Sequence, residues 1–418
     1  MNAAENKRLL ALDILRGITI AGMILVNNPG SWSAIYAPLE HASWNGLTPT
    51  DLVFPFFMFI MGASTYLSLK KFDFRCSRAT VRKILRRVLV IFLIGVGIGW
   101  FSRFCGTFNA LSDEGVPFWE RIGRSCWTFD RMRILGVMQR LALSYGAAAL
   151  IAVTVRHRRI PWIAAGLLAG YFAILLSGHG FEISEQNVVG IVDRAILGPA
   201  HMYRQGDLAF DPEGLLSTIP SIAHVLIGFC CGGLLVGARN LTDKIQNLFL
   251  VGSALMLCGW LLSYGCPINK KIWSPTFVLV TCGMASSLLA LLIWTIDVKG
   301  YRRWSRFFES FGINPLFLYV SAAVLSILLN NIRLPHGNVN VLRQGKGSHA
   351  IENAEVYRFR RTPHLRCHHF PRHAKYLCRR GCVNICPAKE CLLHLPVAAQ
   401  VCQQPQFDLA VVCVQQHT

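Results

Sequence analysis

The strongest constraint on this chain is a series of uncharged apolar segments, each long enough to cross a lipid bilayer. Residues 88–100 and 281–294, for example, are apolar on every side of a helix rather than along one stripe. A hydrocarbon core about 30 Å thick needs roughly 20 helical residues, and backbone groups in lipid must bond within their own segment. The sequence therefore predicts an all-α fold, a polytopic transmembrane helix bundle.

About nine membrane spans are predicted, and each is expected to be helical. They cover residues 9–26, 52–69, 84–104, 134–155, 160–176, 217–236, 248–264, 275–294 and 313–330. The first eight residues are polar and no small-residue cleavage site follows them, so the first span is expected to be retained.

The distribution of positive charge predicts the orientation of these spans. The formal net charge is +20, but the basic residues cluster in short connections after the second, fourth and eighth spans. Such clusters normally mark the cytoplasmic side, and they argue against a nucleic-acid partner. We therefore expect a cytoplasmic N-terminus and place the odd-numbered connections, residues 27–50, 105–133, 178–216 and 265–274, on the opposite side.

The composition changes abruptly near residue 337. We expect a transmembrane domain over residues 1–336 and a Cys- and His-rich tail over 337–418, which contains seven of the fifteen cysteines. Four of these cysteines follow a C-x3-C-x3-C-x4-C pattern, unlike the paired C-x2-C of common zinc folds, so no metal site is expected. A disordered or out-of-frame tail is the favoured interpretation.

The stretch "LEHASWNGLTPTDLVFPFFMFIMG", residues 39–62, is the leading candidate for chemistry. His41 can transfer a proton near neutral pH, and Asn27, at the end of the first span, can donate to a developing oxyanion. A surface or helix-capping histidine is the alternative for His41. Asp51 is expected to cap the second helix, where a carboxylate also suits the helix dipole.

Further polar groups sit inside or beside the spans. Asp13 and Arg16 share one helical face, either as a neutralised pair or as a contact for an anionic ligand, and Arg140 lies deep enough to need a partner. Asp211 is predicted to be the N-cap of the sixth span, with Glu213 in its first turn. Lys270 and Lys271 are either an interfacial anchor or part of a sugar or phosphate contact.

Several motifs together resemble the heparan-alpha-glucosaminide N-acetyltransferases and their bacterial homologues, a family of multi-pass membrane acyltransferases. They are "LDILRGITIAGMILVNN", "HASWNGLTPTDLVFPFFMFIMG", "MRILGVMQRLAL", "GIVDRAILGPAHMY", "AFDPEGLLSTIPSI", "PINKKIWSPTFVL", "DVKG" and "GINPLFLYV", in family order across residues 9–320. Family members normally end with one more transmembrane helix, which the tail replaces here. A frameshift near residues 334–338 is one explanation of this difference.

The resemblance implies an acetyl-CoA-dependent transfer of an acetyl group to an amino sugar on the extracytoplasmic side of a membrane, for a bacterial homologue the inner membrane. It implies that His41 acts as general base or acetyl acceptor and that Asn27 is the second catalytic residue. Arg16 and Arg140 are expected to contact acetyl-CoA, and a homodimer is compatible with the family. The residues expected to bind the sugar are Asn45, Asp51, Asp211 and Glu213. An amino-sugar transporter without transferase activity is the alternative, and a carrier would release no CoA.

Overall fold

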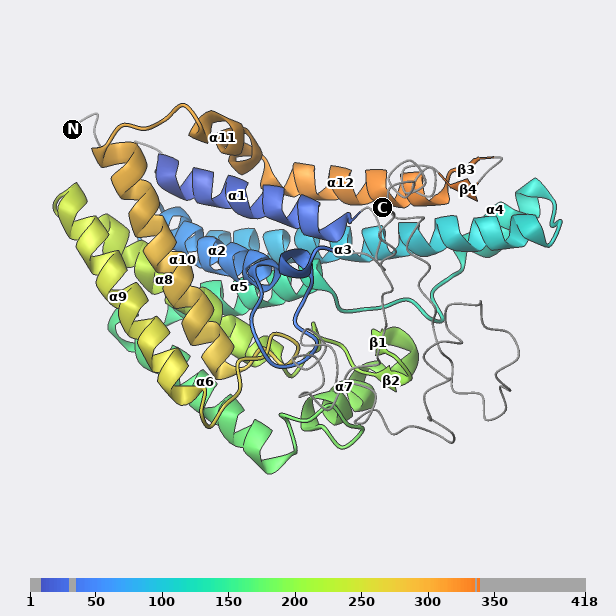
Figure 1. Ribbon diagram of the computed structural model, residues 1–418, viewed down its shortest axis with the longest axis horizontal. Helices are drawn as coiled ribbons and strands as arrows, with labels where there is room; N and C mark the ends of the chain where they lie inside the picture. Colours follow the sequence, from blue (N-terminus) through green and yellow to red (C-terminus); the bar gives the residue numbers. More distant parts are fainter. Residues whose placement is uncertain (1–8, 30–34, 335–336, 339–418) are drawn as a thin grey trace, which may run out of the picture. The chain divides into compact units, whose positions relative to one another are not determined.

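The computed structural model describes residues 9–29, 35–334 and 337–338, and helices dominate this part of the chain (Figure 1). The α-helices are α1 (Leu10–Asn27), α2 (Val53–Lys70), α3 (Arg78–Asp113), α4 (Phe118–Cys126), α5 (Val137–Thr154), α6 (Ile160–Ser177), α7 (Val188–Leu197), α8 (Thr218–Gly237), α9 (Leu241–Leu262), α10 (Pro275–Ile293), α11 (Ser305–Ile313) and α12 (Pro315–Asn331). Short turns of helix are η1 (Ala37–Leu39), η2 (Pro49–Leu52), η3 (His157–Arg159), η4 (Pro199–His201) and η5 (Trp294–Val298). Two small hairpins pair β1 (Arg204–Gln205) with β2 (Leu208–Ala209) and β3 (Arg333–Leu334) with β4 (Gly337–Asn338).

Eight helices in the described ranges are long and apolar enough to cross a membrane, and the bent pair α11 and α12 gives up to nine. The all-α, polytopic fold class predicted from the sequence is therefore confirmed. The tail over 337–418 lies outside the described residues, apart from the two residues of β4.

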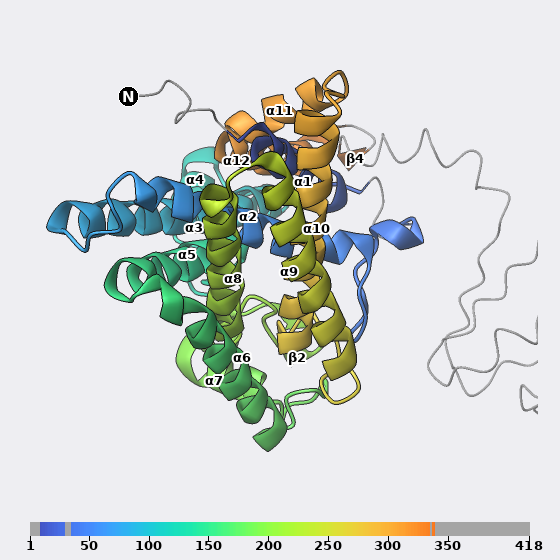
Figure 2. The ribbon, with the colours of Figure 1, turned by 90° about the vertical axis from the view of Figure 1, so that its left-hand side faces the viewer.

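Helix α8 occupies the centre of the packing, in contact with α2, α5, α6 and α10 (Figures 1 and 2). The α2–α8 contact depends on glycine, because a Cβ on Gly228 would lie 2.3 Å from the carbonyl oxygen of Phe59. A Cβ on Gly62 would similarly lie 2.1 Å from the carbonyl oxygen of Val225. Small residues allow such close backbone approach between membrane helices, where van der Waals packing drives association.

Helix α3 is the longest element and lies at the edge of the packing. Thr80 and Ile84 are its buried residues, and its apolar membrane-length window has none. An apolar surface of this kind is typical of a helix that faces lipid.

Three of the predicted span boundaries need correction. The third span extends well beyond residues 84–104 at both ends, and the seventh begins at Leu241 rather than at 248. The ninth is broken at Asn314, where α11 and α12 meet at 86°. The break follows from the sequence Gly312-Ile313-Asn314-Pro315, because proline removes a backbone donor and disfavours helix in the residue before it.

The odd-numbered connections meet at one end of the bundle, as their predicted placement on a single side requires. The N–H of Gly46 donates to the carbonyl of Ile268 at 2.8 Å, and the indole of Trp44 donates to the carbonyl of Phe181 at 2.7 Å. The connection before α5 joins them through Ile134, which donates to His201 at 3.1 Å. The candidate site lies among these connections.

Candidate active site

His41 lies in the connection between α1 and α2, and its imidazole is held by a carboxylate. The Nδ1 atom of His41 is 2.7 Å from Oδ1 of Asp51, which belongs to η2, the turn that leads into α2. Asp51 is 1% exposed, whereas the His41 side chain is 48% exposed. A buried carboxylate therefore holds one ring nitrogen while about half of the ring remains accessible.

The second oxygen of Asp51 takes part in capping, but as the third residue of the η2 capping box rather than as the N-cap, which is Thr48. Its Oδ2 accepts the N–H groups of Ala42 at 3.1 Å and Thr48 at 3.2 Å, and the Thr48 hydroxyl at 3.0 Å. One carboxylate thus stabilises the start of the helix and fixes the position of His41.

The hydrogen-bond partners determine the tautomer of His41. A carboxylate only accepts hydrogen bonds, so Nδ1 carries the proton that is donated to Asp51. In the neutral ring, Nε2 then keeps its lone pair and is free to accept a proton. This arrangement of base and orienting carboxylate is the one that general-base catalysis uses.

Lys270 joins this pair from the connection between α9 and α10. Its ammonium nitrogen is 3.2 Å from Oδ1 of Asp51 and 3.1 Å from Nδ1 of His41. Burial lowers the pKa of Lys270, and the negative charge of Asp51 opposes that effect. The same connection reaches Asn45, whose amide oxygen accepts the Asn269 side-chain N–H at 3.0 Å.

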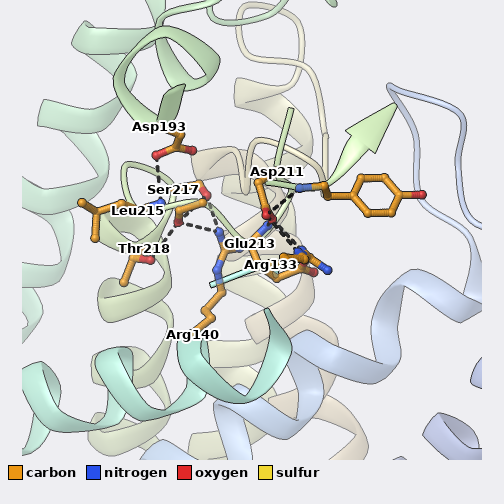
Figure 3. Close-up of polar contacts among 10 residues, drawn as sticks. Arg133, Arg140, Asp193, Asp211, Glu213, Leu215, Ser217 and Thr218 are labelled. Atoms are coloured by element: carbon orange, nitrogen blue, oxygen red, sulfur yellow. Dashed lines mark hydrogen bonds and ion pairs between the residues drawn. The ribbon is translucent and has the colours of Figure 1, made fainter. Parts of the chain in front are cut away.

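A second polar cluster lies before α8, centred on Arg133 (Figure 3). The Arg133 guanidinium donates to both oxygens of Asp211, at 2.9 and 2.5 Å, and also to the carboxylate of Glu213. Burial alone would raise the pKa of Glu213, but the charges of Arg133 and Arg140 outweigh it and lower the pKa. Both carboxylates are therefore paired with Arg133, and this pairing favours the ionised form of Glu213.

The predicted N-cap role of Asp211 is wrong. Helix α8 begins at Thr218, with Ser217 as the residue before it, so neither Asp211 nor Glu213 belongs to its first turn. Asp211 instead accepts the N–H of Glu213 at 2.9 Å and that of Tyr203 at 3.1 Å. The bonds from Arg133 to Asp211 and Glu213 hold these residues in a turn, and α8 begins after it, at Thr218.

Arg140 is fully buried in α5, beneath the same connection (Figure 3). Its guanidinium donates to the carbonyl of Gly214 at 3.2 Å and to the Ser217 hydroxyl. It also lies over the ring of Trp273, 5.0 Å from the ring centroid. Both hydrogen bonds come from Nη2, whereas Nε and Nη1 are buried and have no hydrogen-bond partner among the described residues.

Asp193 completes the second cluster from α7. Its Oδ1 accepts the N–H groups of Leu215 at 2.9 Å and Leu216 at 3.1 Å. Burial raises its pKa to about 6, although these backbone donors oppose the change. A Cβ on Gly214 would lie 1.7 Å from the other carboxylate oxygen, so only glycine fits beside Asp193.

The two clusters are electrostatically linked. The charge of Glu213 raises the pKa of Lys270, and that of Lys270 lowers the pKa of Glu213. Glu213 therefore interacts electrostatically with both the Arg133 cluster and Lys270 of the His41 cluster.

Arg16 lies elsewhere, on the wall of a cavity of about 600 Å³ between α1, α2, α3, α5 and α12. Its guanidinium donates to Asp13 at 2.8 Å, to the Ser64 hydroxyl at 2.7 Å and to the carbonyl of Gly312 at 3.2 Å. The basic residues of the wall are Arg16, Lys83, Arg86 and Arg87, and the apolar ones include Ile20, Met23, Phe57, Ile60, Val90 and Leu141. The cavity can therefore hold a ligand with anionic groups at one part and an apolar chain at another.

Asn27 is the last residue of α1, as predicted, and is exposed. No hydrogen bond joins Asn27 to His41 in the ranges that the structure describes, which exclude residues 30–34 between them. The structure thus brings together His41, Asn45 and Asp51 in one cluster and Arg140, Asp211 and Glu213 in another. Arg16 lines a separate cavity, and Asn27 forms no hydrogen bond to either cluster within the described ranges.

Three contributors to the site were not predicted from the sequence. Lys270 was expected only as an interfacial anchor or a sugar or phosphate contact, and no site role was expected for Arg133 or Asp193. Asp193 had a usable signal, since Asp193 and Arg194 are the two charged residues in the mostly apolar sequence of α7, "VVGIVDRAIL". In the described part of the chain, no group of three His, Cys, Asp or Glu side chains is arranged to hold a metal ion.

Together, fold and site define a polytopic membrane protein with a histidine–carboxylate pair among the connections at one end of its helix bundle. The profile of the family "Heparan-alpha-glucosaminide N-acetyltransferase, catalytic" matches residues 8–264, and the chain belongs to this acetyltransferase family.

Two relatives carry the same family name. The chain is 29% identical to the heparan-alpha-glucosaminide N-acetyltransferase of Mus musculus, with 76% of this chain and 54% of that protein covered. It is 28% identical to that of Homo sapiens, with 76% and 53% covered. The chain therefore spans about half the length of the curated relatives it matches.

Proposed function

We propose that this protein transfers an acetyl group from acetyl-CoA to the amine of an amino sugar, with His41 as the general base. The observation that carries the proposal is the short contact between Nδ1 of His41 and buried Asp51 on a half-exposed ring, with no bond to Nε2 from the described residues. Family membership supports the reaction class.

In the proposed reaction, the neutral amine attacks the thioester carbonyl and forms the C–N bond. Nε2 of His41 takes the proton that the amine loses. The C–S bond then breaks, and the imidazolium returns the proton to the departing thiolate of CoA. The products are the N-acetylated sugar and CoA, and an acetylated Nε2 of His41 is the intermediate of a two-step version.

The remaining site residues have supporting roles in this proposal. Asp51 and Asp211, 1% and 0% exposed at the side chain, act through His41 and Arg133 rather than on the sugar. Glu213, Asn45 and the guanidinium of Arg133 are the groups proposed to meet sugar hydroxyls. Asn27 is proposed to donate to the carbonyl oxygen as it gains negative charge.

The cavity beside Arg16 supports acetyl-CoA as the donor. Guanidinium groups bind phosphates through paired, charge-assisted hydrogen bonds, and the cavity wall carries three arginines and a lysine. Its apolar wall suits the pantetheine chain. Because basic residues normally mark the cytoplasmic side, we propose that acetyl-CoA enters from the cytoplasm and that the sugar binds at the opposite end.

A CoA-release assay in proteoliposomes with a panel of amino sugars tests this function. His41→Asn keeps a side-chain N–H for Asp51 but removes the base, so we expect turnover to fall by about 100-fold or more. His179→Asn, at an exposed histidine in another connection of the same end, is the matched control and should retain turnover. Equal turnover in both variants would remove His41 from the mechanism, and sugar uptake without CoA release would identify a carrier.

A further inference from the structure

The ammonium group of Lys270 lies unusually close to the ring that is proposed to act as the base. Oδ1 of Asp51, Nδ1 of His41 and Nζ of Lys270 form a triangle with sides of 2.7, 3.1 and 3.2 Å. Only the carboxylate can accept a hydrogen bond once Nδ1 is protonated, so His41 and Lys270 both donate to Oδ1. The ammonium is thus held about 3 Å from the imidazole without bonding to it.

This arrangement has a direct consequence for the protonation of His41. The negative charge of Asp51 favours the imidazolium, whereas a positive charge at 3.1 Å disfavours it. A general base works only while it is neutral, so a cation that opposes the charge of Asp51 favours the form of His41 that can take a proton.

We infer that Lys270 is a positioning residue that favours the neutral, proton-accepting form of His41 by offsetting the charge of Asp51. This inference concerns the base of the proposed acetyl transfer and therefore rests on that function. Lys270 acts through His41 and Asp51 and touches no reacting atom.

A purely structural role for Lys270 is a poor explanation, because other bonds already hold its connection in place. Ile268 accepts the N–H of Gly46 at 2.8 Å, and Asn269 donates to Asn45 at 3.0 Å. The neighbouring Lys271 donates to the backbone carbonyl of Ser43. Removing the Lys270 ammonium leaves all three bonds intact.

Other charges near the ring do not replace Lys270. Lys271 interacts with Asp51 and Lys270, but its own hydrogen bond goes to a backbone oxygen. Glu213 acts on Lys270 from the connection before α8, and Glu40 is an exposed chain neighbour of His41. Lys270 is the cation that the structure places within hydrogen-bond distance of both members of the pair.

The test measures how fast diethyl pyrocarbonate modifies His41 between pH 5.5 and 8.5 in the full chain in detergent micelles. Only the neutral imidazole reacts, so the pH midpoint of the rate, followed by peptide mass spectrometry, reports the titration of His41. Lys270→Met and Lys270→Gln remove the charge, Lys270→Arg keeps it, and Lys271→Met is the matched control.

We expect both neutral variants at position 270 to raise the midpoint by at least about one pH unit, the effect of a unit charge roughly 3 Å away in water, which partial burial strengthens. Lys270→Arg should restore the wild-type midpoint, Lys271→Met should give a shift less than half as large, and Asp51→Asn should lower the midpoint. An unchanged or lower midpoint in the two neutral variants, or an equal rise in Lys271→Met, would overturn the inference. Since this readout needs no turnover, a wild-type protein that releases no CoA would contradict the proposed function alone.

Discussion

At the scale of single residues, the site depends on how a few charges are paired. Asp51 bonds His41 with one oxygen and the helix-starting turn with the other, so the capping and catalytic interpretations of this carboxylate are compatible. Arg133 similarly pairs with Asp211 and Glu213. Its own side chain is nevertheless 34% exposed. The groups that can meet a substrate therefore include those held by buried Asp51 and Asp211, rather than these two acids themselves.

The cavity wall provides a prediction for the acetyl donor. Arg86→Gln removes an exposed guanidinium from the wall, and we expect the KM for acetyl-CoA to rise about tenfold, the loss of one hydrogen bond to a charged group. The KM for acetyl-pantetheine, which lacks the phosphates, should not change. Arg158→Gln, at an exposed basic residue outside the cavity wall, is the control. A parallel rise for both thioesters, or none for either, would argue against phosphate binding here.

Asp193 gives a prediction for stability as a function of pH. Burial raises its pKa from 3.8 to about 6, so the folded protein holds this proton more tightly than the unfolded chain. The resulting stabilisation is fully present below about pH 4 and is lost as the pH rises through about 6. Asp193→Asn keeps an oxygen for the N–H groups of Leu215 and Leu216 but does not titrate. The Tm of the wild type should fall relative to the variant between pH 5 and 7, and parallel Tm curves would contradict the raised pKa.

At the scale of elements, backbone contacts between helices limit which side chains fit. The α1–α11 contact resembles the α2–α8 contact, because a Cβ on Gly17 would lie 1.7 Å from the carbonyl oxygen of Phe308. Arg16 strengthens the same region by donating to the carbonyl of Gly312, just before the break between α11 and α12. The bend therefore exposes a carbonyl that a partly buried cation satisfies.

Gly228→Ala tests the glycine contact between α2 and α8. The new methyl group would lie 2.3 Å from a backbone oxygen, so the helices must move apart, and we expect a loss of roughly 1–3 kcal/mol in the free energy of unfolding. Gly97→Ala, on α3, is the control, since nothing lies within 4 Å of its new methyl group. The measurement is the Tm in detergent. Equal Tm values for the two variants would show that this contact tolerates a side chain.

Local signals made most of the elements predictable from the sequence. Apolar length located the spans, and the ends of α1, α6, α8 and α10 fall within one residue of the predicted limits. The lengths of α3 and α9 were underestimated, because polar residues continue a helix beyond the apolar part. Local signals do not predict contacts between residues far apart in the sequence. Lys270 and His41 are separated by 229 residues, and Arg133 and Asp211 by 78.

At the scale of the whole described bundle, the two candidate binding regions differ in character. One is a cavity with basic and apolar walls beside α1, α2 and α3, and the other is a set of paired charges among the odd-numbered connections. The connections that carry the site bond to one another, so they share one end of the bundle. These positions favour an acetyl donor that binds from one side of the membrane and an amino-sugar acceptor that binds on the other.

Transfer across a sealed membrane tests this account most directly. In proteoliposomes of uniform orientation, acetyl-CoA is supplied on the side of the basic connections and the amino sugar is enclosed on the other. We predict that the acetylated sugar accumulates inside while CoA appears outside, and that His41→Asn abolishes both. Acetylation only when both substrates share one compartment, or undiminished transfer by His41→Asn, would contradict the account.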